Sequence, residues 1–141
     1  MKERKNITPV RWGVILALLS LVGIVSIFEL GIRNGWNLAF KISEISLLVM
    51  LLITFIVSYM RTGLWNFSHK PIRDLDEREM EMTSRSLRIA YGLFAVIVLI
   101  LLFVFALLGI KLSVVLAASL LLFAHLLPGA IIAFSEKALR F

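Results

Sequence analysis

The sequence contains no cysteine. Disulfide bonds, thiolate metal sites and thiol catalysis are therefore excluded, and redox chemistry gives no information about the cellular compartment. The sequence also lacks any H-E-x-x-H, P-loop, G-x-S-x-G or paired Cys/His pattern. We accordingly expect no enzymatic activity, no catalytic or metal-binding residues and no cofactor.

Charged residues are scarce as well. They make up 17% of the 141 residues, whereas 60% are hydrophobic, and the mean hydropathy is +0.97. This composition is far too apolar for a soluble domain and predicts an all-α integral membrane protein. The net charge of +6 comes from Lys and Arg beside the apolar runs, where such residues set orientation and attract anionic headgroups. We therefore expect the lipid bilayer, and not nucleic acid, as a partner.

The apolar residues form four long runs that are hydrophobic on every side, as lipid-facing helices are. The first run lacks the short core and small-residue cleavage site of a signal peptide, so we expect it to be retained. The third and fourth runs together are too long for one membrane helix, so the chain must reverse between them, with Gly109 as a left-handed cap. The prediction is a single membrane domain, 1–141, with four transmembrane helices as two hairpins joined by a cytosolic connector: spans at about 12–30, 42–60, 89–108 and 112–134, and the connector at 61–88.

The distribution of Lys and Arg predicts the orientation of these spans. Arg33, Lys41 and Lys111 fall in the two short loops, whereas every other Lys and Arg lies in the N-terminal segment, the connector or the C-terminal tail. Because positive charge is retained on the cytoplasmic side, both termini and the connector are expected there. Tyr59, at the end of the second span, is expected at the membrane edge.

The connector is expected to end in a helix. Asp76 stands three residues before Glu79, the spacing of a capping box. No glycine or proline follows before Gly92, which predicts one helix over about 76–108 that extends the third span into the cytosol. Glu81 and Arg85 are spaced for an ion pair between successive turns of this helix.

The same segment carries a resemblance. The string Leu75-Asp76-Glu77-Arg78-Glu79, followed by a polar helical turn and then by Arg88-Ile89-Ala90-Tyr91, resembles the D-E-R signature of small uncharacterised multi-pass membrane proteins of bacteria and archaea, grouped as a domain of unknown function. The resemblance implies a prokaryotic origin, hence the cytoplasmic (inner) membrane, and a cytosolic motif, but no activity. We interpret the motif as a docking surface for a membrane-protein partner or a second copy of the chain, formed by Asp76, Glu77, Arg78, Glu79 and Arg85.

Ionisable side chains inside apolar spans are the other candidates, because a charge there costs at least about 2.5–3.5 kcal/mol. The candidate intramembrane polar site comprises His125, Glu29 and Glu44. His125 is expected to face protein, since Ala118, Gly129 and Ile132 lie on roughly the same face of its helix and small residues permit close helix packing.

Two roles stay open for His125. The first is functional: the imidazole relays protons or ligates a cofactor. The second is structural: it forms a hydrogen bond to a serine, threonine or carbonyl of the adjacent helix. His69, the other histidine, lies in the connector, so a haem held by two histidines of one chain is not expected, whereas a His–Met pairing stays open. Glu29 and Glu44, with Arg33 and Lys41, form either an outward-facing ion or substrate mouth or interfacial ion pairs.

Two functions remain. The first is a non-enzymatic accessory subunit or regulator that acts through helix packing and a charged cytosolic connector helix. The alternative is a small oligomeric transporter or channel for an ion or proton, using His125 or Glu29 and Glu44. The third span offers no polar side chain between Gly92 and Gly109, and a transport path usually needs several at mid-depth, so the sequence favours the first.

Overall fold

The computed structural model describes residues 7–135, without the side chains of Ile7, Phe67, Ser68 and Ile72. All regular structure in this range is helical. The elements in chain order are α1 (Ile7–Asn34), α2 (Leu38–Phe55), its π-helical continuation η1 (Ile56–Met60), α3 (Leu64–His69), the 3-10 turn η2 (Ile72–Asp74), α4 (Glu77–Leu108) and α5 (Val114–Phe134).

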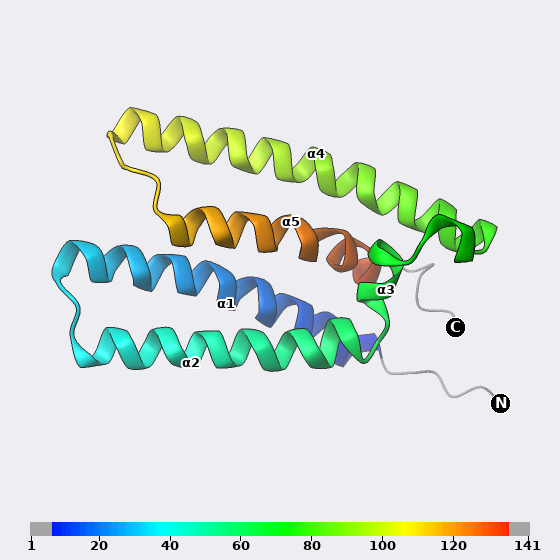
Figure 1. Ribbon diagram of the computed structural model, residues 1–141, viewed down its shortest axis with the longest axis horizontal. Coiled ribbons are helices and arrows are strands. Elements are labelled where there is room, and N and C mark those ends of the chain that lie inside the picture. The colour runs from blue at the N-terminus through cyan, green and yellow to red at the C-terminus, as the bar shows by residue number, and fades with distance from the viewer. Residues whose placement is uncertain (1–6, 136–141) are drawn as a thin grey trace.

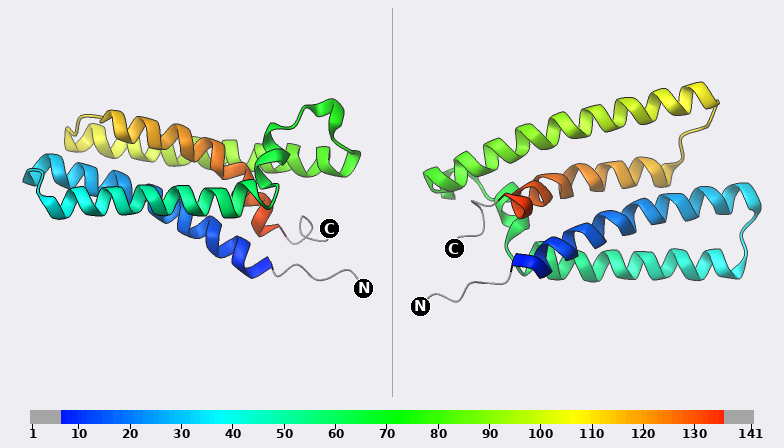
Figure 2. Two further views of the ribbon diagram at one scale, coloured as in Figure 1. Left: turned by 60° about the horizontal axis from the view of Figure 1, so that its bottom comes forward. Right: turned by 180° about the vertical axis from the view of Figure 1, so that it is seen from behind.

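The four long helices lie side by side in the order α4, α5, α1, α2 (Figure 1). Residues 7 and 135 lie at one end of this array, called the terminal end below, together with α3 (Figure 2). The turns at 35–37 and 109–113 lie at the opposite end, called the loop end. Helix α5 therefore has α1 on one side and α4 on the other.

The prediction of an all-helical chain with four membrane-length segments is confirmed for the described residues. Four helices are long and apolar enough to cross a membrane: Thr8–Asn34, Leu38–Met60, Glu77–Leu108 and Val114–Phe134. Helices α1 and α2 both extend further toward the turn at 35–37 than the predicted spans do. Helix α2 begins this early because Asn37 caps it by accepting a hydrogen bond from the Phe40 N–H at 2.9 Å.

Local sequence signals fix both ends of α4. Asp76 is its N-cap, and the reciprocal bonds of a capping box with Glu79 are both present. Gly109 ends the helix with φ of 63°, a left-handed conformation that glycine adopts without steric cost. Both predictions are confirmed. Ser113 then caps α5 by accepting from the Leu116 N–H at 3.1 Å.

The core lies toward the terminal end, between α1, η1 and α5. Its fully buried members include Val14, Ala17, Leu126 and Ala133. Tyr59 is also buried, with 1% of its surface exposed. The reason is Gly129, where an added Cβ would lie 3.0 Å from the Tyr59 ring; the missing side chain makes room for the aromatic ring against α5.

Glycine also allows α1 to approach η1. A Cβ on Gly13 would lie 1.7 Å from the Ser58 Oγ and 3.0 Å from its Cβ. At the end of the same interface the Arg11 Nε donates to the Ala133 carbonyl at 3.1 Å, which ties α1 to the last turn of α5. In contrast, none of the most apolar part of α4 is buried within the described structure.

Candidate functional site

The predicted docking residues divide into two groups in the structure. Asp76 and Glu79 hold the start of α4: the Asp76 Oδ1 accepts from the Arg78 N–H at 2.6 Å, and Glu79 Oε2 accepts from the Asp76 N–H at 3.3 Å. Glu79 also pairs with Lys70 at 3.5 Å, which ties the connector to the helix. Glu77 is exposed, whereas Arg78 and Arg85 line a pocket. The motif is thus partly structural, and its two arginines are the members that line a cavity.

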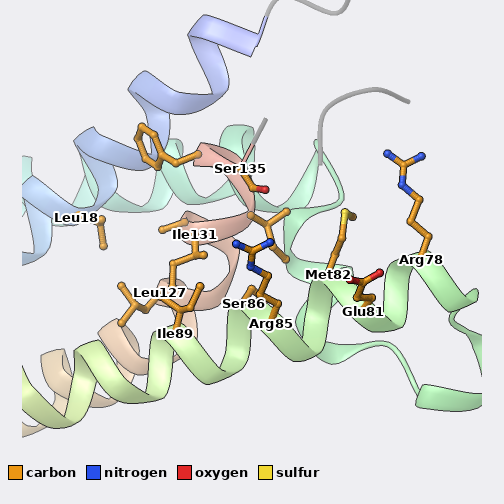
Figure 3. Close-up of a pocket in the computed structure, with 13 residues that line it drawn as sticks. Leu18, Arg78, Glu81, Met82, Arg85, Ser86, Ile89, Leu127, Ile131 and Ser135 are labelled. Atoms are coloured by element: carbon orange, nitrogen blue, oxygen red, sulfur yellow. The ribbon is translucent and has the colours of Figure 1, made fainter. Parts of the chain in front are cut away.

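This pocket has a volume of about 690 Å³ and lies between the first turns of α4 and the last turns of α5. Leu18 of α1 also lines it (Figure 3). Apolar side chains dominate its wall, with the polar groups gathered along α4 and at the end of α5. The lining residues are Leu18, Met82, Ile89, Leu127, Ala130, Ile131, Ile132 and Phe134, with Arg78, Glu81, Arg85, Ser86 and Ser135 as the polar members.

Arg85 occupies the centre of this arrangement. Its side chain extends from α4 toward Ser135 at the end of α5, whereas Arg78 extends away from the apolar wall (Figure 3). Arg85 makes no ion pair with Glu81, so that prediction is wrong. Within residues 7–135 the Arg85 guanidinium has no hydrogen-bond or ion-pair partner. The pocket therefore offers a cationic group above an apolar wall.

The sequence analysis did not find this pocket, although part of its signal is present. Met82, Arg85 and Ile89 are spaced by three and four residues, so they share one face of α4. The opposite wall comes from α5, more than forty residues further along the chain, and no local pattern indicates that these two faces meet.

His125 does not lie where the sequence placed it. It is exposed, its Nδ1 lies 2.8 Å from the Leu121 carbonyl of its own helix, and Ala118 is exposed too. The expected bond to an adjacent helix is therefore not formed, although Gly129 and Ile132 are buried as expected.

His125 instead faces the connector. The Trp65 and His69 rings of α3 stack with centroids 3.8 Å apart, and the His69 ring lies 6.1 Å from that of His125 at an interplanar angle of 11°. His69 lies in the connector as expected, but the sequence did not indicate that its ring would approach that of His125. The two rings meet because α3 folds back from η1 onto α5 and buries Leu64.

Each ring of the histidine pair is bonded to its own helix. The His69 Nδ1 lies 2.9 Å from the Trp65 carbonyl oxygen, and the His125 Nδ1 lies 2.8 Å from the Leu121 carbonyl oxygen. Because a carbonyl oxygen only accepts, the Nδ1–H donates in both bonds. No group of three or more His, Asp or Glu side chains in the described part of the chain is placed to hold a metal ion. The two rings are better explained as a contact that fastens α3 to α5.

The polar residues near the loop end form no ion pairs. Neither Glu29 nor Glu44 pairs with Arg33, Lys41 or any other residue that the structure describes. One carboxylate oxygen of each glutamate, Glu29 Oε1 and Glu44 Oε2, is buried without a hydrogen-bond partner there. The expectation of interfacial ion pairs is therefore wrong, and both carboxylates keep unused acceptor atoms.

Comparisons with protein-family models, with curated proteins and with solved structures find no match for this chain. Three features of the chain itself remain as the basis for a function: the charged start of α4 with its pocket, the contact of α3 with α5, and the two unpaired glutamates.

Proposed function

We propose that the protein is a non-enzymatic multi-pass protein of a prokaryotic cytoplasmic membrane. It serves as an accessory subunit or regulator, through helix packing and through the charged start of α4 on the cytosolic side. The prokaryotic assignment comes from the resemblance of the D-E-R segment. The four long apolar helices support the membrane assignment.

Charge and geometry together support the orientation. Residues 7, 61–76 and 135 share the terminal end of the array (Figure 1). Arg11, Arg61 and Lys70 lie toward this end, whereas Arg33, Lys41 and Lys111 lie toward the loop end. The positive-inside rule therefore assigns the terminal end to the cytosol, with the array as two transmembrane hairpins and residues 61–76 between them.

The observation that carries the proposal is the fixed position of the charged start of α4. The capping box and the Lys70–Glu79 ion pair hold the first turn. The α3 segment that precedes it is in turn packed against α5 through Leu64 and the His69–His125 contact. A rigid, exposed, charged helix end is suited to recognition, because little ordering entropy is lost when a partner binds.

A second surface supports assembly within the membrane. The most apolar part of α4 has no fully buried residue in the single chain. One side of this helix packs on α5, with the Phe94 ring against that of Phe123, and the remaining surface is available to lipid, to a partner's helix or to a second copy. Association there proceeds by van der Waals packing, as between transmembrane helices generally.

The proposal is tested with Arg78→Glu and Asp76→Asn. Asparagine still caps a helix, so Asp76→Asn removes charge without removing the cap. The full chain is expressed in membranes, solubilised gently and assayed for oligomer size and for co-purifying proteins. We expect both variants to insert normally and to lose assembly, with Arg78→Glu the more severe.

Lys111→Glu is the matched control, because it makes the same change of charge in the exposed turn at the loop end. It is expected to leave assembly unchanged. Wild-type assembly in Arg78→Glu, or equal loss in Lys111→Glu, contradicts docking through the start of α4.

One observation favours the second candidate, a small oligomeric transporter or channel for an ion or proton. The unpaired buried oxygens of Glu29 and Glu44 are acceptors for a proton or cation. Transport predicts that Glu29→Gln with Glu44→Gln abolishes a flux into proteoliposomes, and that His125→Ala does so if the path extends to mid-depth. Absence of flux for protons and common cations in the wild-type protein excludes this function.

A further inference from the structure

The pocket between α4 and α5 has two chemically distinct parts. Its wall is apolar and includes Ile89, Leu127 and Ile131, whereas Arg85 lies beside that wall, directed toward Ser135 (Figure 3). Its volume of about 690 Å³ falls in the range of sites that hold small molecules. An occupant that satisfies both parts must carry a negative charge and a hydrocarbon portion on one molecule.

The charge of the pocket specifies an anion. Among the lining residues that the structure describes, Arg78 and Arg85 stand against one carboxylate, that of Glu81. The guanidinium of Arg85 has no partner within residues 7–135. A guanidinium presents paired N–H donors in a plane that matches two oxygens of a phosphate, and such charge-assisted bonds are among the strongest in proteins.

The position of the pocket along α4 indicates its depth in the membrane. This inference rests on the orientation proposed above. Arg88 and Tyr91 follow Arg85 within two turns, and Tyr91 is 77% exposed. Beyond them α4 is apolar as far as Leu108. Trp12 of α1, at the same end, is 60% exposed. Exposed Tyr and Trp beside arginines mark the headgroup level of a bilayer, so the pocket opens there in the cytosolic leaflet.

We propose that this pocket binds an anionic phospholipid of the cytosolic leaflet. Its phosphate is held by Arg85, with Arg78 contributing long-range attraction. One acyl chain lies along the apolar wall formed by Ile89 of α4 and by Leu127 and Ile131 of α5. The lipid thereby bridges α4 and α5 next to the charged start of α4.

The experiment uses the full-length protein in nanodiscs that contain equal amounts of phosphatidylglycerol and phosphatidylcholine with identical acyl chains. Native mass spectrometry identifies the lipids that stay bound when the protein is ejected from the nanodisc. We expect the wild type to retain phosphatidylglycerol in preference to phosphatidylcholine. Arg85→Gln should reduce this preference at least about tenfold. Both lipids carry a phosphate, but choline neutralises it, so the guanidinium's attraction to the net negative charge of phosphatidylglycerol is what distinguishes the two lipids and is what the variant loses.

Two further variants separate the contribution of the lipid headgroup from that of its acyl chain. Ile131→Trp fills the apolar wall and should lower retention of both lipids, whereas Arg73→Gln removes an equal charge from the connector, outside the pocket, and should change nothing. Equal retention of the two lipids by the wild type, or an equal effect of Arg73→Gln and Arg85→Gln, overturns the proposal.

Other occupants give different results. If inorganic phosphate at millimolar concentration displaces phosphatidylglycerol completely, the site recognises a free anion and the lipid proposal is overturned. If phosphatidylglycerol binds only after removal of residues 136–141, the chain's own tail is the occupant and the proposal is likewise overturned.

The same preparations distinguish failure of this inference from failure of the proposed function. A protein that inserts and assembles but shows no lipid preference contradicts the lipid site alone. A wild-type protein that prefers phosphatidylglycerol, together with an Arg78→Glu variant that still assembles normally, contradicts docking alone. A protein absent from the membrane fraction contradicts both.

Discussion

The contact between α1 and η1 offers a sharp test of the packing, through two glycines that differ in their surroundings. Gly13 and Gly92 both lie within long helices. A Cβ on Gly13 would lie 1.7 Å from the Ser58 Oγ, whereas a Cβ on Gly92 would have nothing within 4 Å. Alanine at each position gains a similar amount of helix propensity, up to about 1 kcal/mol.

The difference between Gly13→Ala and Gly92→Ala therefore isolates the cost of overpacking. The Ser58 Oγ can rotate away, but its Cβ at 3.0 Å from the added methyl cannot, so α1 and η1 must separate. Inserting a methyl group into a well-packed contact costs about 1–3 kcal/mol. We expect Gly13→Ala to be less stable than Gly92→Ala by about that amount.

The assay is reversible unfolding of the purified protein in mixed micelles by added denaturing detergent, followed by circular dichroism. The double variant Gly13→Ala, Ser58→Gly removes the obstructing side chain and should recover most of the loss. Equal stability of the two single variants, or no recovery in the double variant, refutes the close approach of α1 to η1.

Further predictions concern the core, the cap, the connector and the orientation. Leu126→Ala should lower the free energy of unfolding by about 2–5 kcal/mol, because its side chain is fully buried, which the same unfolding assay measures. Asp76→Ala should cost about 0.5–2 kcal/mol while Asp76→Asn costs little, since only asparagine still caps. His69→Ala should speed proteolysis within residues 61–76, because it removes the contact with α5; an unchanged rate contradicts the fastening role. Single cysteines at Ser84 and Asn34, in a chain that has no cysteine of its own, should be labelled from the cytosolic and the outer side respectively; the reverse pattern contradicts the orientation.

The features that the sequence predicted correctly depend on interactions between residues that are close together in the chain. The capping box at Asp76 and Glu79 needs atoms only three residues apart, and the left-handed cap at Gly109 depends on one residue's backbone freedom. Continuous apolar runs likewise decide where long helices form, whatever packs against them. The ends of α1 and α2 were less well predicted because Asn37 begins α2 before the charged Lys41.

The site was poorly predicted because it depends on contacts between distant segments. His69 and His125 are separated in the sequence by all of α4 and half of α5, and they meet only because α3 folds back onto α5. The pairing of Glu81 with Arg85 was expected from helical spacing, yet the two side chains line a cavity whose other wall is α5. The burial of Tyr59 was not predicted for the same reason, since the room that Gly129 leaves for its ring is a property of two helices together.

The central place of α5 has a consequence for biogenesis. It contacts α1, α3 and α4, yet it is the last of the four long helices in chain order. In the membrane orientation proposed above, α1 and α2 would enter the bilayer and pair first, while the flank of α1 that receives α5 is still covered by lipid. Residues 61–76 would then be fastened only when this last helix arrives. A ribosome stalled before residue 114 would thus leave a chain whose earlier helices have inserted while the segment between the hairpins still lacks its contacts with α5.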